Sequence, residues 1–328
     1  MKKLFLIFLL LIGINLTTKA QANDDWRTKA AEAMQKGNQK ESLNWLIVGA
    51  ENGDSFAQYS VAVYYLQGYG TAKDLKKVEY WASKSALQGD SHGQSLLGDL
   101  YFNEYNDNEK AIYWWEQAAN QDDLHCIQNL GKLYLNGKNE IKKDIPKAFE
   151  WIRKAAFIGD ADAQLLLGDV NYQGEFNFPV NYKEAFNWYN KAANQNNAEG
   201  LYKAGYMLAY NDDVPQDLKK GFEYLSKSAQ LGFSAAYNDL AYFYAKGMYV
   251  PQNFSMAHEM VDEAINADPT SPEAVTYYDS KGEIYLMEGK QNEAIQIWNK
   301  IKRDFPQYMD YISDSNFVNS IKSITNEK

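Results

Sequence analysis

Small and large apolar residues recur along the chain in one pattern, Ala-x-x-Trp-x-x-x-Ala-Ala, with polar residues between them. Successive copies lie 33–37 residues apart. Positions i, i+3, i+7 and i+8 share one face of a helix, so each copy predicts an amphipathic helix. The ring is expected to fill the gap where a neighbouring helix comes close. The large position holds Trp45, Trp81, Trp114, Trp151, Trp188, Tyr224, Met260 and Ile297. Eight copies in phase predict a repeat protein.

A second pattern, Leu-Gly-x-x-Tyr, predicts another helix in each repeat. Its clearest copies begin at Leu97 and Leu130. The Gly, or an Ala in its place, marks the point where two backbones are expected to come closest. Loops such as Val214-Pro215-Gln216-Asp217 separate the two helices, because Pro stops a helix and Asp caps the next one. Turns such as Gly89-Asp90 close the repeat.

No segment alternates between apolar and polar residues for long enough to predict a strand. The unit is therefore helix, loop, helix, turn. The fold class we predict is all-α, a solenoid of about eight antiparallel helix pairs in a single array.

These motifs resemble the Sel-one-like repeat (SLR) family, a relative of the tetratricopeptide repeats. The best-matching stretches are residues 126–159 and 163–193, and the resemblance covers about residues 43–264. It implies a right-handed superhelix whose first helices line a concave groove. Grooves of this kind bind proteins or peptides. Residues near Asp268-Pro269 and Gly282-x-x-Tyr285 resemble an ordinary tetratricopeptide repeat instead.

We expect five segments along the chain. They are a secretory signal peptide over 1–22, a degenerate N-terminal capping repeat over 23–52, the SLR solenoid over 53–267, a tetratricopeptide-like repeat over 268–304, and a C-terminal capping helix and tail over 305–328. Terminal repeats are expected to be atypical because each has a neighbour on one side only.

The signal peptide is predicted from the first 22 residues. Lys2 and Lys3 precede a 13-residue apolar run over 4–16, and small residues follow at Ala20 and Ala22. Spanning a bilayer takes roughly 20 apolar residues, so cleavage after Ala22 is favoured over an uncleaved anchor. No later apolar stretch is long enough to span. We therefore expect a periplasmic or secreted protein with no integral membrane segment after cleavage.

Groove residues are predicted by carrying over the concave positions of tetratricopeptide helices relative to Leu-Gly-x-x-Tyr. The partner-binding candidates are His92, Asp99, Phe102, His125, Lys132, Asp169, Tyr172, Tyr202, Tyr206 and Tyr242. The same positions also hold Ser95, Gln128, Leu135, Asp162, Leu165, Glu199 and Asn238. Tyrosine combines a large contact area with a hydrogen bond at low entropic cost. The alternative for each Tyr is that it only covers the surface of its helix.

Charge and composition narrow the partner class. Thirty-three Lys and Arg face 43 Asp and Glu, which gives a net charge of -10. Nucleic acid is not expected as a partner, because phosphate binding needs a positive surface. Three His and one Cys provide little for a metal site. His92 and His125 occupy equivalent positions of adjacent repeats, so their side chains are candidates for neighbours on the groove wall.

Nothing in the sequence predicts catalysis or a cofactor. The single thiol, Cys126, occupies the repeat position that holds Ala57, Gly93, Ala163, Gly200 and Ala236 elsewhere, which predicts a small, unreactive core residue. Gly-x-Ser-x-Gly and His-Glu-x-x-His motifs are absent from the sequence. Carboxylate pairs such as Asp122-Asp123 lie in predicted turns, where acidic residues cap helices.

The function we predict is therefore non-enzymatic binding of another protein or peptide in the concave groove. An immunity protein that neutralises a secretion-system effector is one role, and SLR proteins serve in it. A regulator or scaffold of an envelope sensor or cell-wall machine is a second role, and a secreted factor that contacts host proteins is a third. A cell-wall or β-lactam hydrolase and a self-assembling solenoid are the alternatives outside this class. A capped solenoid with a polar tail favours a monomer.

Overall fold

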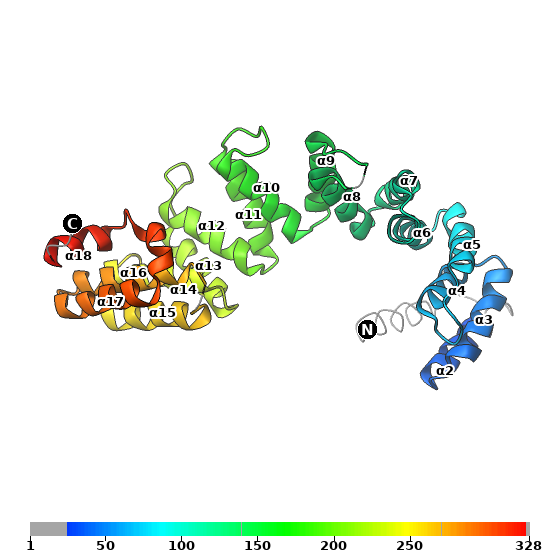
Figure 1. Ribbon diagram of the computed structural model, residues 1–328, viewed down its shortest axis with the longest axis horizontal. Helices are drawn as coiled ribbons and strands as arrows, with labels where there is room; N and C mark the ends of the chain where they lie inside the picture. The colour runs from blue at the N-terminus through cyan, green and yellow to red at the C-terminus, as the bar shows by residue number, and fades with distance from the viewer. Residues whose placement is uncertain (1–24, 139, 270, 326–328) are drawn as a thin grey trace. The chain divides into compact units, whose positions relative to one another are not determined.

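A computed structural model describes residues 25–138, 140–269 and 271–325, so the signal-peptide prediction lies outside the described residues. The chain folds as two compact units, residues 1–158 and 159–328 (Figure 1). The first unit contains α2 (Asp25–Gln35), α3 (Gln39–Glu51), α4 (Ser55–Gln67), α5 (Leu75–Leu87), α6 (Ser91–Asn103), α7 (Asn108–Ala119), α8 (Leu124–Asn136) and α9 (Ile145–Phe157). None of the described helices is both long and apolar enough to cross a membrane.

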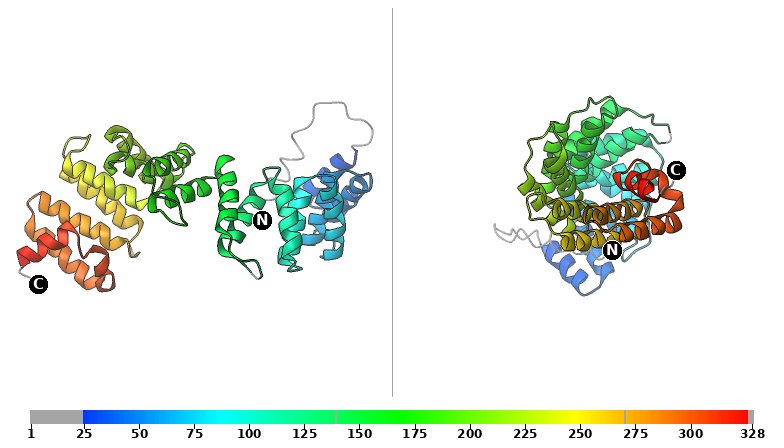
Figure 2. Two further views of the ribbon diagram at one scale, coloured as in Figure 1. Left: turned by 90° about the horizontal axis from the view of Figure 1, so that it is seen from above. Right: turned by 90° about the vertical axis from the view of Figure 1, so that its left-hand side faces the viewer.

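The second unit continues the same alternation of helices. It contains α10 (Ala161–Gln173), α11 (Tyr182–Asn194), α12 (Ala198–Tyr210), α13 (Leu218–Gln230), α14 (Ser234–Lys246), α15 (Phe254–Ala267), α16 (Ala274–Met287), α17 (Gln291–Asp304), the 3₁₀ helix η1 (Pro306–Ile312) and α18 (Asn316–Thr325). Each even-numbered helix from α2 to α16 pairs with the next helix, and we call these the first and second helices of a repeat. Figure 2 shows the same helices from two further directions. The eight helix pairs confirm the predicted all-α solenoid.

The turns between repeats follow the sequence prediction closely. In the six turns from α3–α4 to α13–α14 one residue adopts the left-handed conformation, for example Gly89 with φ 87° and Asn196 with φ 60°, which glycine and asparagine adopt with least strain. The residue that follows is often an acid or amide that caps the next first helix. Asp90 Oδ1 accepts from the Gly93 backbone N–H at 3.0 Å, and Asn197 Oδ1 accepts from Gly200 N–H at 2.9 Å.

The loops inside the repeats use the same device. Asp217 Oδ1 accepts from Lys220 N–H at 3.0 Å, and Asn253 Oδ1 accepts from Met256 N–H at 3.1 Å, so the Asp or Asn after Val-Pro-Gln caps the second helix as predicted. The backbone N–H of the capping residue also donates to a carbonyl of the first helix, as from Asn253 to Tyr244 at 2.9 Å. This bond closes the loop onto the end of the first helix.

The close packing within a pair corrects the prediction about the Trp column. The large residue of the Ala-x-x-Trp pattern is only half-buried at Trp114 and Trp151. The residue after it packs against the Gly of the first helix instead, and Trp115 is 2% exposed. A Cβ at Gly98 would lie 2.2 Å from Trp115 Cδ1. The small predicted positions Ala111, Ala118 and Ala119 are fully buried as expected, so the correction concerns only which large residue meets the Gly.

The two helix layers pack differently within each unit. Consecutive first helices contact one another, as α6 does α8 and α12 does α14, whereas consecutive second helices of the described chain make at most marginal contact. In a curved stack the layer with the closer helices lies on the inside. The first helices therefore form the inner, concave face of each unit, and we call this layer the first-helix face.

Aromatic side chains cover glycines in the first and the last helix pair. Trp26 of α2 covers Gly49 of α3 within the first pair, and Phe317 of α18 covers Gly282 of α16. Both rings are buried. The C-terminal core also includes residues of η1 and α17. The last helix pair is therefore covered by η1 and α18.

Candidate partner-binding face

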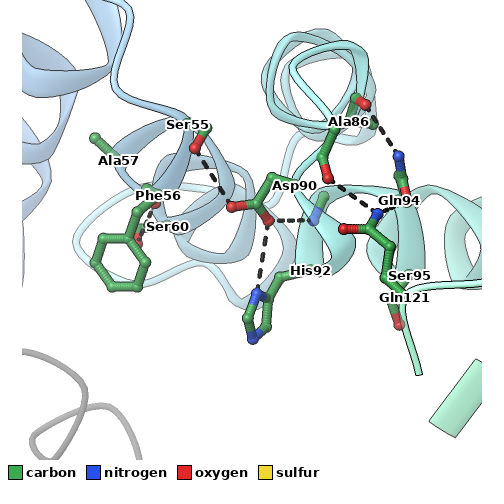
Figure 3. Close-up of polar contacts among 12 residues, drawn as sticks. Ser55, Phe56, Ala57, Ser60, Ala86, Asp90, His92, Gln94, Ser95 and Gln121 are labelled. Atoms are coloured by element: carbon green, nitrogen blue, oxygen red, sulfur yellow. Dashed lines mark hydrogen bonds and ion pairs between the residues drawn. The ribbon is translucent and has the colours of Figure 1, made fainter. Parts of the chain in front are cut away.

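The two histidines on the first-helix face of the first unit bind different carboxylates. His92 Nδ1 lies 3.6 Å from Asp90 Oδ1, as Figure 3 shows, and its ring lies against Tyr59 with centroids 5.4 Å apart. His125 Nε2 lies 3.0 Å from Asp99 Oδ2. Each hydrogen bond favours the protonated imidazole and raises the pKa of its histidine. Among the described residues no group of three metal-binding side chains forms.

Asp99 joins two helix pairs through its carboxylate. Trp115 Nε1 of its own repeat donates to Asp99 Oδ1 at 3.0 Å, and His125 of the next repeat contacts both carboxylate oxygens. Asn129 Nδ2 lies 3.0 Å from the same imidazole nitrogen. Asp99 and His125, both predicted as partner-binding candidates, therefore lie together. Their polar atoms also link two adjacent repeats.

A cleft of about 340 Å³ opens between α6 and α8 on this face. We call it the α6–α8 cleft. Four of the predicted groove residues, Asp99, Phe102, His125 and Lys132, lie together in its lining. Lys138 Nζ stands 4.1 Å from the centroid of the Phe102 ring. The remaining lining residues are Asn103, Trp115, Asn129, Leu133, Asn136 and Gly137. The cleft combines an aromatic wall with cationic and amide groups, which suits a polar side chain or backbone segment of a partner.

Asp169 repeats the arrangement of Asp99 in the second unit. Tyr189 of its own repeat donates to Asp169 Oδ1 at 2.7 Å, and Lys203 Nζ of the next repeat lies 2.5 Å away. Lys203 also pairs with Glu199 at 2.8 Å. Tyr172 packs edge-on against Tyr182, with centroids 5.1 Å apart. Leu165, offered as a groove position, is 7% exposed and belongs to the core, so that prediction is wrong.

Tyrosines form a row along α12. Ring centroids are 6.2 Å apart between Tyr202 and Tyr206 and 5.1 Å apart between Tyr206 and Tyr210. Phe233 lies 4.9 Å from Tyr202. Tyr206 is 37% exposed. We call Tyr202, Tyr206 and Tyr210 the tyrosine row. Tyr242, the remaining candidate, is not part of the row, since its hydroxyl donates to Glu283 Oε2 at 2.5 Å.

Sequence reasoning missed two features of this face. The first is a glutamine pair inside a repeat: Gln121 Nε2 donates to Gln94 Oε1 at 2.8 Å, and Gln94 Nε2 donates to the Ala86 carbonyl of the preceding repeat at 3.3 Å (Figure 3). Gln58 with Gln88 and Gln164 with Gln195 repeat it. Because these glutamines recur at the repeat spacing, the sequence carried the signal. The second feature is Asp239, a buried acid. The equivalent residue differs in chemical type from one repeat to the next.

The comparisons with known proteins agree with this architecture. The family model of the Sel1 repeat matches residues 55–90, 91–123, 125–156, 161–197, 198–233 and 234–268, which is more than half of the chain. The chain belongs to the Sel1 repeat family. The six matched repeats run from α4 to α15, and the pairs α2–α3 and α16–α17 flank them.

Two solved structures are similar over most of the chain. One is c5321, a protective antigen present in uropathogenic Escherichia coli strains and displaying an SLR fold, with 26% identity and a TM-score of 0.68 over 84% of this chain and 60% of that one. The other is a Sel1 repeat protein from Oxalobacter formigenes, with 27% identity and a TM-score of 0.55 over 75% of this chain and 71% of that one.

A curated relative matches more locally. A sel1-like repeat-containing protein of Acanthamoeba polyphaga mimivirus is 40% identical over 70 residues, which is 21% of this chain and 14% of the viral protein. The chain thus spans a small part of this relative and about three fifths of the E. coli antigen. Proteins of the Sel1 repeat family are generally non-enzymatic interaction scaffolds, and the protein–protein interaction module is the function class that fits this chain.

The one cysteine of these Sel1 repeats is a core residue. Cys126 is fully buried, and its Sγ lies 3.2 Å from Ser95 Oγ. Burial raises the pKa of the thiol well above its usual range, so the reactive thiolate is disfavoured. The core position predicted for Cys126 is confirmed. Asp123 caps α8 by accepting from the Cys126 N–H at 2.9 Å, which gives one member of the Asp122-Asp123 pair a structural role.

Proposed function

We propose that this Sel1 repeat protein binds a protein partner on its first-helix face without catalysing a reaction. The observation that carries the proposal is the α6–α8 cleft, in which Phe102, His125 and Lys132 gather from two repeats around an open volume of about 340 Å³. The tyrosine row adds a second contact surface in the second unit. Aromatic and cationic side chains of this kind dominate the energetics of many protein interfaces.

We place the protein in the periplasm or outside the cell. Support comes from the basic start, the short apolar run over 4–16 and the small residues at Ala20 and Ala22. Expression with a C-terminal tag, cell fractionation and N-terminal sequencing test this placement. A mature chain beginning at Asn23 in the periplasm or medium is expected, whereas an uncut chain in the cytoplasm would refute it.

The specific role we propose is that of an immunity protein, which neutralises an effector delivered by a secretion system. The net charge of -10 favours a basic partner through long-range attraction, and the proposed location would bring the two proteins together in the envelope. Cells that survive periplasmic expression of the neighbouring effector gene only when this protein is present would support the role. Equal survival without it, together with a changed response of an envelope sensor, would favour the regulatory alternative.

Binding itself is tested by affinity capture with the tagged protein from envelope extracts. Lys132→Ala and Tyr206→Ala alter the two contact surfaces, and Tyr113→Ala is the matched control, because Tyr113 is an exposed tyrosine of a second helix. We expect one protein to be captured by the wild type and the control, and to be reduced at least tenfold in one of the two face variants. Equal capture by all variants would move the interface off the first-helix face.

A further inference from the structure

Asp239 is a buried acid on the first-helix face that has no obvious internal role. It lies on α14 and is 9% exposed. Its Oδ2 atom is buried and has no hydrogen-bond partner. An unpaired carboxylate oxygen in a protein interior costs free energy, and a retained group of this kind needs an explanation beyond packing.

Two other buried polar atoms on these helices are in the same condition. Tyr210 Oη of α12, and Asn238 Oδ1 of the residue before Asp239 in the sequence, have no hydrogen-bond partner among the described residues. Burial raises the pKa of the Tyr210 phenol, and the nearby negative charge of Asp239 raises it further. Asp239 Oδ2 and Asn238 Oδ1 can each accept a hydrogen bond, and the Tyr210 hydroxyl can accept one as well. A ligand that supplies several N–H donors would satisfy them together.

The phenols of the tyrosine row interact electrostatically with the same carboxylate. The Asp239 charge raises the pKa of Tyr202, Tyr206 and Tyr210 in addition to the effect of burial, and Tyr277 of α16 is affected in the same way. These four phenols are the titratable groups that act on Asp239 from the elements packed around it. Aromatic faces attract cations, so the rings and the carboxylate favour the same kind of ligand.

The preceding repeat has an ion pair where Asp239 has no counter-ion among the described residues. Lys203 of α12 and Asp239 of α14 occupy equivalent places, since each directly precedes the two small or apolar residues of the first-helix motif. Lys203 reaches back to Asp169, and each charge has its counterpart. Asp239 forms no ion pair with any Lys, Arg or His of the described residues. The array therefore contains an acid without a cation where its neighbour contains a matched pair.

We propose that Asp239 and the tyrosine row receive an arginine side chain of the protein partner. The inference rests on the proposed binding function and names the chemistry of one contact. A guanidinium offers five N–H donors in a planar fork, stacks on aromatic rings and keeps its charge when buried. The exposed ring of Tyr206 is the part of the row that a partner reaches first.

The protonation state of Asp239 in the free protein predicts that arginine binding is linked to proton release. Burial raises the pKa of Asp239 to about 7, and only a hydrogen bond with Tyr202 acts in the opposite direction. The free protein therefore carries a protonated Asp239 below pH 7, whereas a bound guanidinium favours the carboxylate. Arginine binding must release a proton in that range. Affinity is expected to rise by as much as tenfold for each pH unit up to about pH 7, and to level off above it.

A matched pair of peptides tests the site in the full-length protein. Gly-Gly-Arg-Gly-Gly and its citrulline counterpart differ in charge but hardly in shape, and isothermal titration calorimetry measures both. We expect the arginine peptide to bind the wild type at least about tenfold more tightly at pH 8. Asp239→Asn should abolish this preference, and Tyr206→Ala should weaken it. Glu223→Gln is the control, because Glu223 is an exposed acid of the second helix α13, and it should keep the preference.

Several results would overturn the inference. They are equal binding of the two peptides, an undiminished preference in the folded Asp239→Asn variant, or an affinity for the arginine peptide that does not change between pH 5.5 and 8. Circular dichroism verifies that each variant is folded, and Tyr206→Ala provides an independent test if Asp239→Asn is not. A failure here would leave the proposed function intact if the captured protein still depended on Lys132 or Tyr206. Loss of that dependence is what would refute the function itself.

Discussion

Replacing Gly98 by alanine tests the packing of the helix pairs. In an exposed helix this change stabilises, because Ala is favoured over Gly by about 1 kcal/mol. Here the added Cβ would lie 2.2 Å from Trp115 Cδ1 and 2.5 Å from Trp115 Nε1. The indole must move, although it is 2% exposed and donates to Asp99 at 3.0 Å.

The balance of these terms predicts a net loss. Overpacking of a core costs about 1–3 kcal/mol, and disturbing a hydrogen bond to a carboxylate costs about 1.5–3 kcal/mol. After the gain of about 1 kcal/mol in helix propensity, we expect Gly98→Ala to lower the free energy of unfolding by about 1.5–5 kcal/mol. Gly131 is the matched control at the same repeat position. There the nearest atom to an added Cβ is Ile152 Cγ1 at 3.3 Å, so a small shift suffices and the net change should lie within about 1 kcal/mol of zero.

Urea denaturation followed by circular dichroism and by tryptophan fluorescence measures both variants. Because a repeat array can lose its parts separately, hydrogen exchange of α6 and α7 shows where the loss occurs. We expect earlier unfolding and faster exchange in these two helices for Gly98→Ala alone. A Gly98→Ala protein as stable as the wild type, or a Gly131→Ala protein equally destabilised, would refute the packing argument.

Three further predictions concern buried polar groups. The pKa of Asp239 is raised to about 7, so the folded protein holds a proton that the unfolded chain releases near pH 4, and stability falls as the pH rises from about 4 to 7. Asp239→Asn should therefore unfold at higher urea concentration than the wild type at pH 8, by up to about 4 kcal/mol, and at a similar concentration at pH 4; identical urea midpoints at both pH values would contradict this. Lys203→Met should cost about 1–3 kcal/mol in chemical denaturation, because it leaves Asp169 without its cation, and an unchanged midpoint would show that the pair is dispensable. Cys126 should resist a thiol reagent such as dithionitrobenzoate in the native protein and react fully in urea, whereas fast native labelling would show that the thiol is accessible.

The helices, their order and their ends could be read from the sequence because the signals are local. A helix face depends on residues three or four positions apart, and a cap depends on one side chain and a backbone N–H three residues later. Asp217 and Asn253 therefore cap the helices that were expected to start after them. Eight phased copies repeat these local signals, because each repeat packs against its neighbour in the same way.

The candidate face was only partly predictable. Carrying over the groove positions located Phe102, His125 and Lys132 correctly enough that one cleft contains them. The same rule placed Leu165 on the surface, but the ring of Tyr189 and the residues around it enclose Leu165 in the core. The Trp column was chosen for its size, whereas the contact with Gly98 is made by Trp115, the next residue. Which of two neighbouring large residues meets the glycine is a matter of packing, which the repeat pattern alone does not specify.

The repeat, its family and the secondary structure of each unit follow from local residue patterns. Which polar side chain meets which depends on how the helices pack in space. Asp99 with His125, and Asp169 with Lys203, are 26 and 34 residues apart. Asp239 has the same repeat position as Lys203 but no counter-ion. Such pairings depend on distances of a few ångströms across two helix layers, and they decide whether a charged group is a structural link or remains available to a partner.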